Sequence, residues 1–402
     1  MNRVVITGIG VVSPVGNQID QFWSALVEGR SGIRAIENIP TTRFNTRIAA
    51  QVAGFNPDAH FEPKRLGQLD RFTQFAVVAA RAALRDSGLE IDEELALDAA
   101  TIIGTGVGGQ NTTDDTYLKF YGENSSKVHP LTIPRLMANA AASQISMDLG
   151  LKGPTYSIVS ACASGTHAIG QAFQMVRLGQ APIAIAGGTE ACLTVGTIRA
   201  WEALRILSSD TCRPFSKNRS GLVLGEGAAI LVLESRERAL ARGARIYAEL
   251  TGFGMSADAA DLISPDVDGA VRAIRAALRD ARVNADDIDY VNAHGTGTTV
   301  NDKTETKALR GVFGPHADKL AVSSNKAVLG HGLGCAGALE AAATALALHT
   351  QIAPPTANFD EQDPECDLDY VPNVARPMTI RSAISNSFAF GGLNAVLLLG
   401  RA

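Results

Sequence analysis

The six residues RAALRD at positions 81–86 recur unchanged at positions 275–280. In both copies a helical pattern leads into a short apolar strand, which ends in GTG at 104–106 after the first copy and in HGTG at 294–297 after the second. Other strand-length apolar runs alternate with helical patterns, as in layered α/β proteins. The repeat therefore predicts two copies of one α/β unit within the chain.

A second pair of segments also looks alike. Residues 158–170 and residues 322–340 each pass from a short strand into a helix rich in glycine and alanine. Chance similarity between short Ala/Leu helices is the alternative interpretation. We predict an N-terminal half at 1–250 and a C-terminal half at 251–402.

The composition describes a globular protein with a large core. Of the 402 residues, 46% are hydrophobic and 19% are charged, and the formal charge of -5 argues against nucleic acid as the main partner. No apolar run reaches the roughly 18 residues of a membrane span, and the first apolar run is too short for a signal peptide. The five cysteines include no Cys-x-x-Cys pair, which favours reduced thiols in the cytoplasm over disulfides or zinc.

Cys162 is the candidate nucleophile. It lies in SACASG at residues 160–165, at the start of a small-residue helix without an acidic residue. Backbone amides at the helix N-terminus are expected to lower the pKa of this thiol. The alternative is a buried structural cysteine, which is the role we expect for the other four.

Two histidines are candidate donors to an oxygen that becomes negative. His294 lies in NAHGTGT at 292–298, and His331 follows Lys326 by five residues. Either histidine could instead cap a turn or fill the core. Strand ends gathered on one side by right-handed crossovers would let both meet Cys162, and a buried lysine could hold them neutral. His167 would point about 140° away from Cys162 along the helix and is interpreted as structural.

Two glycine runs, GIG at 8–10 and GTGVGG at 104–109, do not form a dinucleotide-binding pattern. The chain also has no Walker-type Gly-Lys-Ser/Thr sequence. We interpret these runs as tight turns or as walls of a narrow channel.

Taken together, the motifs resemble those of the β-ketoacyl-[acyl-carrier-protein] synthases of the elongating Cys-His-His branch, over essentially the full length. They are SACASG (160–165), CRPFS (212–216), GEGA (225–228), NAHGTGT (292–298), GHGLGCAGALE (330–340) and NSFAFGG (386–392). The resemblance implies the thiolase-like fold, with duplicated halves in a five-layer α-β-α-β-α sandwich. It also implies a homodimer that needs no cofactor and works with acyl carrier protein in its acyl and malonyl forms, without nucleic acid or membrane.

The resemblance assigns roles to the main site residues. Cys162 would take the acyl chain as a thioester, and its amide with that of Phe390 would form the oxyanion hole. His294 and His331 would hydrogen-bond the malonyl thioester and stabilise the enolate formed as carbon dioxide leaves. The product would be a 3-oxoacyl chain on the carrier protein.

Supporting roles follow from the same resemblance. Lys326 and Glu340 would organise the histidines, and a structural monovalent cation, Na⁺ or K⁺ in some relatives, would lie near Asn292, Glu340 and Ser385. Thr296 and Thr298 would contact the pantetheine arm. Val107 and Phe390 would touch the acyl pocket or its gate. The residues expected to dock the carrier protein are Lys64, Arg65, Lys127 and Arg205.

The chain departs from the family pattern at its gate, where Ala389 and Leu393 replace glycine and threonine. Segments 201–205 and 363–372 are similar to nodulation-type synthases, so a pathway-specific nodulation- or polyketide-type paralogue is one alternative function. A non-catalytic partner subunit of the chain-length-factor type is a second, although Cys162 is present. A degradative thiolase ranks last, because residues 385–394 contain no second cysteine.

Overall fold

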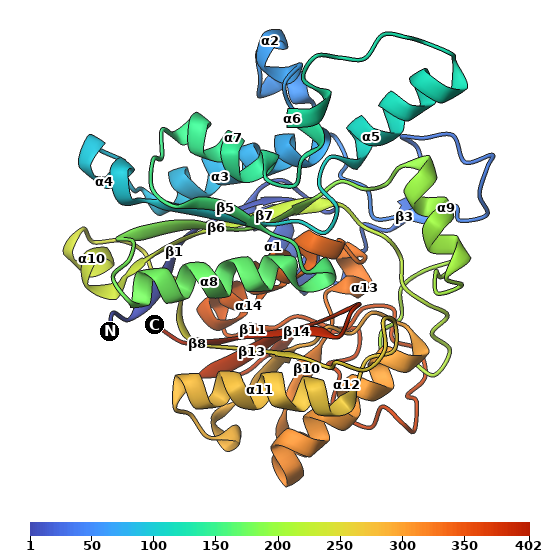
Figure 1. The fold of residues 1–402 in the computed structure, drawn as a ribbon. Helices are drawn as coiled ribbons and strands as arrows, with labels where there is room; N and C mark the ends of the chain where they lie inside the picture. Colours follow the sequence, from blue (N-terminus) through green and yellow to red (C-terminus); the bar gives the residue numbers. More distant parts are fainter.

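The computed structural model describes residues 1–402 and has five layers, α-β-α-β-α (Figure 1). Helix α3 (Arg71–Ser87) covers one outer face and α11 (Val267–Ala281) covers the other. Helices α8 (Ser164–Arg177) and α14 (Ala336–Thr350) fill the middle layer. The predicted thiolase-like sandwich is therefore confirmed.

The two halves share one strand order. It is β5-β4-β6-β7-β1 in the first half and β10-β9-β13-β14-β8 in the second. In each half the first two pairings are parallel and the next two antiparallel. The halves join where β1 pairs with β8. The strands are β1 (Val4–Val12), β4 (Ala100–Gly104), β5 (Thr155–Ile158), β6 (Ile183–Glu190), β7 (Gly227–Ser235), β8 (Ala248–Ala257), β9 (Tyr290–Asn292), β10 (Ala321–Ser323), β13 (Ser382–Ala389) and β14 (Leu393–Gly400).

Smaller elements connect these layers. The helices are α1 (Ile19–Val27), α2 (Pro63–Leu66), α4 (Glu93–Asp98), α5 (Gln110–Tyr117), α6 (Thr132–Leu136), α7 (Ala140–Leu149), α9 (Val195–Ala203), α10 (Arg236–Ala241), α12 (Thr299–Phe313) and α13 (Lys326–Leu329). Two short ribbons, β2 (Arg34–Ala35) with β3 (Ile48–Ala49) and β11 (Ile352–Ala353) with β12 (Arg376–Pro377), lie outside the main sheet.

The repeated RAALRD sequence has a physical reason. It forms part of α3 in the first half and of α11 in the second, and its final aspartate turns toward the neighbouring strand. Asp86 accepts the backbone N–H of Ile9 on β1, and Asp280 accepts that of Phe253 on β8, both at 2.9 Å. The same residue therefore ties helix to strand in both halves.

Glycines let each outer helix lie close to its strand. A Cβ on Gly10 would lie 1.9 Å from the carbonyl oxygen of Ala79 in α3, and one on Gly254 would lie 2.2 Å from that of Ala273 in α11. Only glycine permits such an approach. The interpretation of residues 8–10 as a turn or channel wall was wrong, because they lie inside β1 where α3 packs against it.

The middle layer is the most buried part of the protein. Nearly every side chain of α14 is buried, because this helix packs against α8 and against strands of both halves. The residues that precede α8 and α14 therefore lie deep between the two sheet halves. No helix has both the length and the apolar character needed to cross a membrane.

Candidate active site

Cys162 lies in a tight turn between β5 and α8. Residues Ala161–Ala163 form a 3₁₀ turn, and Ala161 has a φ of +49°, in the left-handed region that side chains disfavour. The Ser164 hydroxyl donates to the Ala161 carbonyl oxygen at 2.6 Å and accepts the Ser160 N–H at 2.9 Å. These bonds fix the thiol at the helix N-terminus.

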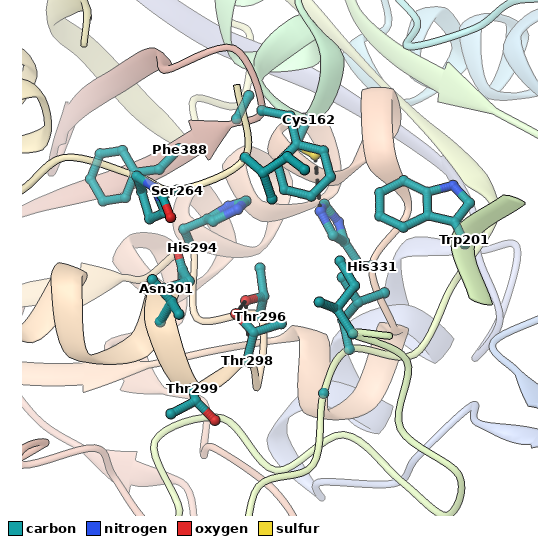
Figure 2. Close-up of a pocket in the computed structure, with 18 of the residues that line it drawn as sticks. Cys162, Trp201, Ser264, His294, Thr296, Thr298, Thr299, Asn301, His331 and Phe388 are labelled. Carbon is teal, nitrogen blue, oxygen red and sulfur yellow. Dashed lines mark hydrogen bonds between the residues drawn. The ribbon is translucent and has the colours of Figure 1, made fainter. Parts of the chain in front are cut away.

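His331 precedes the equivalent turn of the second half. Leu333–Cys335 form a 3₁₀ turn, and Leu333 has a φ of +48°. The backbone N–H of Leu333 donates to His331 Nδ1 at 3.3 Å, and His331 Nε2 lies 3.1 Å from Cys162 Sγ (Figure 2). Because Nδ1 accepts, the proton of the neutral ring is on Nε2, which donates toward the sulfur.

His294 follows strand β9 and has the same tautomer for a different reason. Lys326 Nζ lies 3.4 Å from His294 Nδ1, and an ammonium can only donate. The proton of the neutral ring is therefore on Nε2 here too. The His294 and His331 rings lie 5.4 Å apart at an interplanar angle of 84°, so their donors approach one space from two directions.

Burial, helped by a nearby positive charge, keeps both histidines neutral. Burial, followed by the Lys326 ammonium, lowers the pKa of His331 well below its usual range, and the same causes act on the pKa of His294. Lys326 forms a salt bridge with Glu340, and both side chains are buried. Burial raises the pKa of Glu340 to about 7, although Lys326 opposes this shift. Lys326 thus lies close enough to both histidines to act on their charge, and Glu340 pairs with it.

The thiol of Cys162 behaves differently from the sequence-based expectation. Burial raises its pKa to about 12, and the Lys326 charge and the backbone N–H groups of Phe390 and Cys162 oppose that rise without overcoming it. The expected lowering by helix amides alone was therefore wrong. The pKa of the thiol therefore lies above neutral pH.

A cavity of ≈ 260 Å³ joins these groups. Nine-tenths or more of the Cys162, His294 and His331 surfaces are buried, yet all three line its wall (Figure 2). The hydroxyls of Thr296 and Thr298 lie 2.9 Å apart on the same wall. Other predicted residues that line this cavity are Phe390 and Arg205, and Trp201 lines it without having been predicted.

Two glutamates that the sequence reasoning missed fix the backbone around the site. Glu305 on α12 accepts the backbone N–H groups of His294 and Gly295 at 2.8 and 2.7 Å. Glu190, at the end of β6, accepts those of Gly106 and Gly334 at 2.6 and 3.0 Å. An acidic residue 11 positions after His294 was the only signal for Glu305 that the sequence offered.

The residues predicted near a monovalent cation fit one. Asn292 Oδ1, Glu340 Oε2 and Ser385 Oγ are all buried and lack hydrogen-bond partners. Asn292 and Ser385 are also paired in register on β9 and β13. Oxygen atoms of this kind are the ligands that hard cations prefer, and a buried polar atom without a partner is costly.

The remaining predicted positions lie away from the thiol. Val107 is 49% exposed and does not line the cavity with Cys162. Lys64 and Arg65 lie on α2, and Lys127 borders a separate cavity of ≈ 470 Å³. Of the four predicted docking residues, Arg205 is the one that borders the catalytic cavity.

A buried thiol faced by two neutral imidazole donors, within a duplicated thiolase-like fold, is the arrangement expected of a condensing enzyme. Comparison with known proteins agrees. Residues 1–239 match the family described as "Beta-ketoacyl synthase, N-terminal domain", and residues 247–360 match "Beta-ketoacyl synthase, C-terminal domain". The chain belongs to the β-ketoacyl synthase family and is an acyltransferase.

Individual relatives cover almost the whole chain. Nodulation protein E of Rhizobium sp. (strain N33) is 46% identical over 98% of each chain. The 3-oxoacyl-[acyl-carrier-protein] synthase 2 of Coxiella burnetii (strain RSA 493 / Nine Mile phase I) is 45% identical over 99% of this chain and 98% of its own. The solved structure titled "The ishigamide ketosynthase/chain length factor" is 39% identical, with a TM-score of 0.96, and covers 100% of this chain and 99% of its own.

Proposed function

We propose that this chain catalyses the decarboxylating condensation of an acyl thioester on Cys162 with malonyl carrier protein. The observation that carries the proposal is the position of the His331 donor 3.1 Å from Cys162 Sγ, inside a cavity that His294 also lines. One product is 3-oxoacyl carrier protein, and the others are carbon dioxide and free carrier protein. Housekeeping elongation and a nodulation- or polyketide-type pathway both use this reaction.

The first half-reaction loads the enzyme. The sulfur of Cys162 attacks the acyl carbonyl, and the carrier thiol leaves with the proton that the cysteine loses. The backbone N–H groups of Cys162 and Phe390 would stabilise the negative carbonyl oxygen, because both act on the sulfur and lower its pKa. This geometry supports Phe390 as one donor of the oxyanion hole.

The second half-reaction forms the carbon–carbon bond. His294 and His331 donate their Nε2 protons to the thioester oxygen of the malonyl group, which becomes an enolate oxygen as the carbon–carboxylate bond breaks. The enolate carbon attacks the acyl carbonyl on Cys162. The tetrahedral intermediate then collapses, and the released thiolate takes a proton from solvent. Neutral histidines suit this role because each keeps one donor proton without a net charge.

A cation would support this machinery indirectly. Asn292, Glu340 and Ser385 would hold a bound Na⁺ or K⁺ at their unpartnered oxygen atoms. Its positive charge would stabilise the buried Glu340 carboxylate and so fix the Lys326 ammonium beside His294. The reaction itself needs no cofactor, because the histidine donors and the cysteine supply its chemistry.

The carrier protein is the proposed partner. One relative is named 3-oxoacyl-[acyl-carrier-protein] synthase 2, and Arg205 supplies a positive charge beside the cavity. Thr296 and Thr298 would hydrogen-bond the pantetheine arm as it passes along the wall. Lys64, Arg65 and Lys127 would meet acidic groups of the carrier farther from the thiol.

We also propose a homodimer and a cytoplasmic location. Strand β5 is at the edge of the sheet, and apolar side chains beside it are exposed, including Tyr156 at 39% and Val159 at 55%. A second copy of the chain would cover them. All five cysteines are free, which supports a reducing compartment.

A non-catalytic partner subunit would be expected to lack the nucleophile. This alternative has no support, since Cys162 and both histidines line one cavity. The thiolase alternative also lacks support, because none of the other four cysteines lines that cavity. The similarity to a nodulation protein favours the synthesis of a specialised acyl chain as the second candidate function.

Intact mass measurement tests the proposal. Wild-type protein and Cys162→Ala are incubated with carrier proteins that bear acyl chains from short to long, and then with malonyl carrier protein. We expect a thioester adduct on the wild type only, and at least about a 10³-fold slower condensation in the variant, since the nucleophile is absent. No adduct with any chain length would refute the proposed function.

A further inference from the structure

A second cavity, of ≈ 470 Å³, lies between α5 and the chain that leads into the neighbouring helix α6 (Figure 1). It shares no lining residue with the cavity around Cys162, so a ligand here goes beyond the proposed function. Its volume is within the range of about 300–1,000 Å³ that is typical of small-molecule sites. Val128 is the one apolar side chain in its wall. A ligand must therefore be held by polar and charged groups.

The charged groups of this wall are mostly positive. Three cationic side chains line the cavity, and none of them forms a salt bridge: Lys119, Lys127 and Arg135. Asp115 is the one acidic side chain among the lining residues. Three positive charges and one negative charge leave the wall with a net charge of +2. Like charges gathered around one space repel each other, and an anion between them relieves that repulsion.

Arg135 is the least satisfied of these cations. Its Nε is buried and has no hydrogen-bond partner. The charge of Arg135 acts on the buried Asp70 carboxylate and lowers its pKa, although burial raises that pKa by more. The Asp70 oxygen atoms instead accept the backbone N–H groups of Phe72 and Thr112, at 3.2 and 2.7 Å. A buried donor without an acceptor is costly, and a guanidinium group matches the oxygen atoms of a phosphate.

Neutral donors complete the wall. His129 Nδ1 accepts the backbone N–H of Leu131 at 3.2 Å, so the proton of the neutral ring is on Nε2 and can reach a ligand. The Ser125 hydroxyl accepts the backbone N–H of Lys127 at 3.2 Å, and its own proton is free to donate. The Thr132 hydroxyl donates to the His129 carbonyl oxygen at 2.8 Å. These bonds shape the segment before α6 around the cations.

We propose that this cavity binds a phosphate dianion, either free or at the end of a small phosphate monoester. A phosphate monoester carries a charge of about -1.5 to -2 at pH 7 and three strong acceptor oxygen atoms. Its charge balances the net charge of the wall, and its oxygen atoms accept from the Arg135 guanidinium, the two lysines and His129. A single carboxylate would leave one positive charge unbalanced.

Isothermal titration calorimetry of the whole protein, in a chloride buffer at low ionic strength, tests the proposal. Inorganic phosphate and glycerol 3-phosphate are the probes, and glycerol is the uncharged control. We expect one saturable site for the charged probes, weaker binding as sodium chloride is added, and no binding of glycerol. Equal affinities identify free phosphate as the ligand, whereas tighter binding of glycerol 3-phosphate identifies an ester.

Variants locate the site. Arg135→Gln should weaken binding about 10- to 100-fold, the range expected for loss of hydrogen bonds to a charged group. Lys119→Gln should weaken it about two- to fivefold, because this side chain is exposed. The matched controls are Arg43→Gln and Lys152→Gln, which remove exposed charges outside the cavity and should change the affinity by less than about twofold.

Two results would overturn the proposal. One is the lack of saturable binding of either charged probe up to about 10 mM. The other is a loss of affinity in the controls equal to that in Arg135→Gln and Lys119→Gln, which would show that binding occurs elsewhere. Thermal unfolding without probe checks that each variant folds. The exposed position of Lys119 keeps the test decisive even where the half-buried Arg135 cannot be replaced.

Discussion

The turn before α8 and the turn before α14 have the same backbone but different side chains. Ala161 and Leu333 begin them with φ values of +49° and +48°, and a 3₁₀ turn leads into the helix in both. The next residue is Cys162 in the first turn and Gly334 in the second. A Cβ on Gly334 would lie 2.1 Å from the Gly106 nitrogen, so the second turn has no room for a nucleophile.

This difference shows how a duplicated fold builds one asymmetric site. The first turn keeps an open place for the thiol. At the equivalent position of the second turn, Gly334 packs against Gly106 and donates its backbone N–H to Glu190. The candidate functional group of this turn is His331, which precedes it. Both turns have the same positive φ, and only the first carries the proposed nucleophile.

Removing the donor beside the second turn should have the largest effect. His331→Ala and His294→Ala should each lower the condensation rate about 10²–10³-fold, as loss of one oxyanion donor does in other enzymes. The double variant should fall by less than the product of the two losses. Turnover with malonyl carrier protein measures this, and His349→Ala at the exposed end of α14 is the control. Losses below about tenfold would contradict the donor roles.

The thiols of the two turns should respond differently to pH. Cys162 lines the cavity, whereas Cys335 in the second turn is fully buried. Since the pKa of Cys162 is raised to about 12, its thiolate fraction should rise about tenfold per pH unit from pH 7 to pH 10. Iodoacetamide labelling followed by peptide mass analysis measures this, with Cys162→Ala as background. A plateau below pH 9, or faster labelling of Cys335, would contradict the expectation.

Filling the second turn should destabilise the fold. Gly334→Ala places a methyl group against the Gly106 nitrogen and the Glu190 carboxylate, and should lower the free energy of unfolding by about 1–3 kcal/mol. Denaturant titration measures the loss. Gly67→Ala is the control, because its Cβ would lie 3.7 Å from its neighbours and should change stability by less than about 0.5 kcal/mol. Equal stability of the two variants would show that the turn adapts.

Relieving the strain of the first turn should have the smallest effect. Ala161→Gly removes the Cβ that opposes a positive φ, which outweighs the entropy that glycine adds to the unfolded chain, for a net gain of about 0.5–1 kcal/mol in unfolding free energy. Ala163→Gly, two residues on at a φ of -92°, should instead lose about 0.5–1 kcal/mol. Thermal unfolding compares them. A loss in both variants would show that the first turn is not strained.

Much of the architecture could be predicted from local signals. The RAALRD repeat identified α3 and α11 as equivalent helices. The aspartate that ends the repeat accepts a strand N–H in both halves, so it occurs at the same place in both copies. The motifs around Cys162, His294 and His331 identified three residues that line one cavity. Residues 8–10 were misread, since a glycine in a strand and a glycine in a turn look the same in sequence.

The missed residues act across long sequence distances. Glu190 connects Gly106 with Gly334, and Trp201 stacks on Phe390, so neither partner is near in sequence. The direction of the Cys162 pKa was also missed. Helix amides are visible in a sequence pattern, whereas the burial that outweighs them depends on every neighbouring element.

The sequence by itself determined the duplication, the family motifs and the identity of the thiol and its two histidines, because periodicity and short motifs are local properties of a chain. Only the tertiary structure decided which ring nitrogen of each histidine carries the proton, and which turn has room for a nucleophile. The position of the His294 proton and the space beside Gly334 depend on contacts between residues that are distant in sequence, Lys326 with His294 and Gly334 with Gly106. The contact of Gly334 with Gly106 exists only once the two halves are packed together.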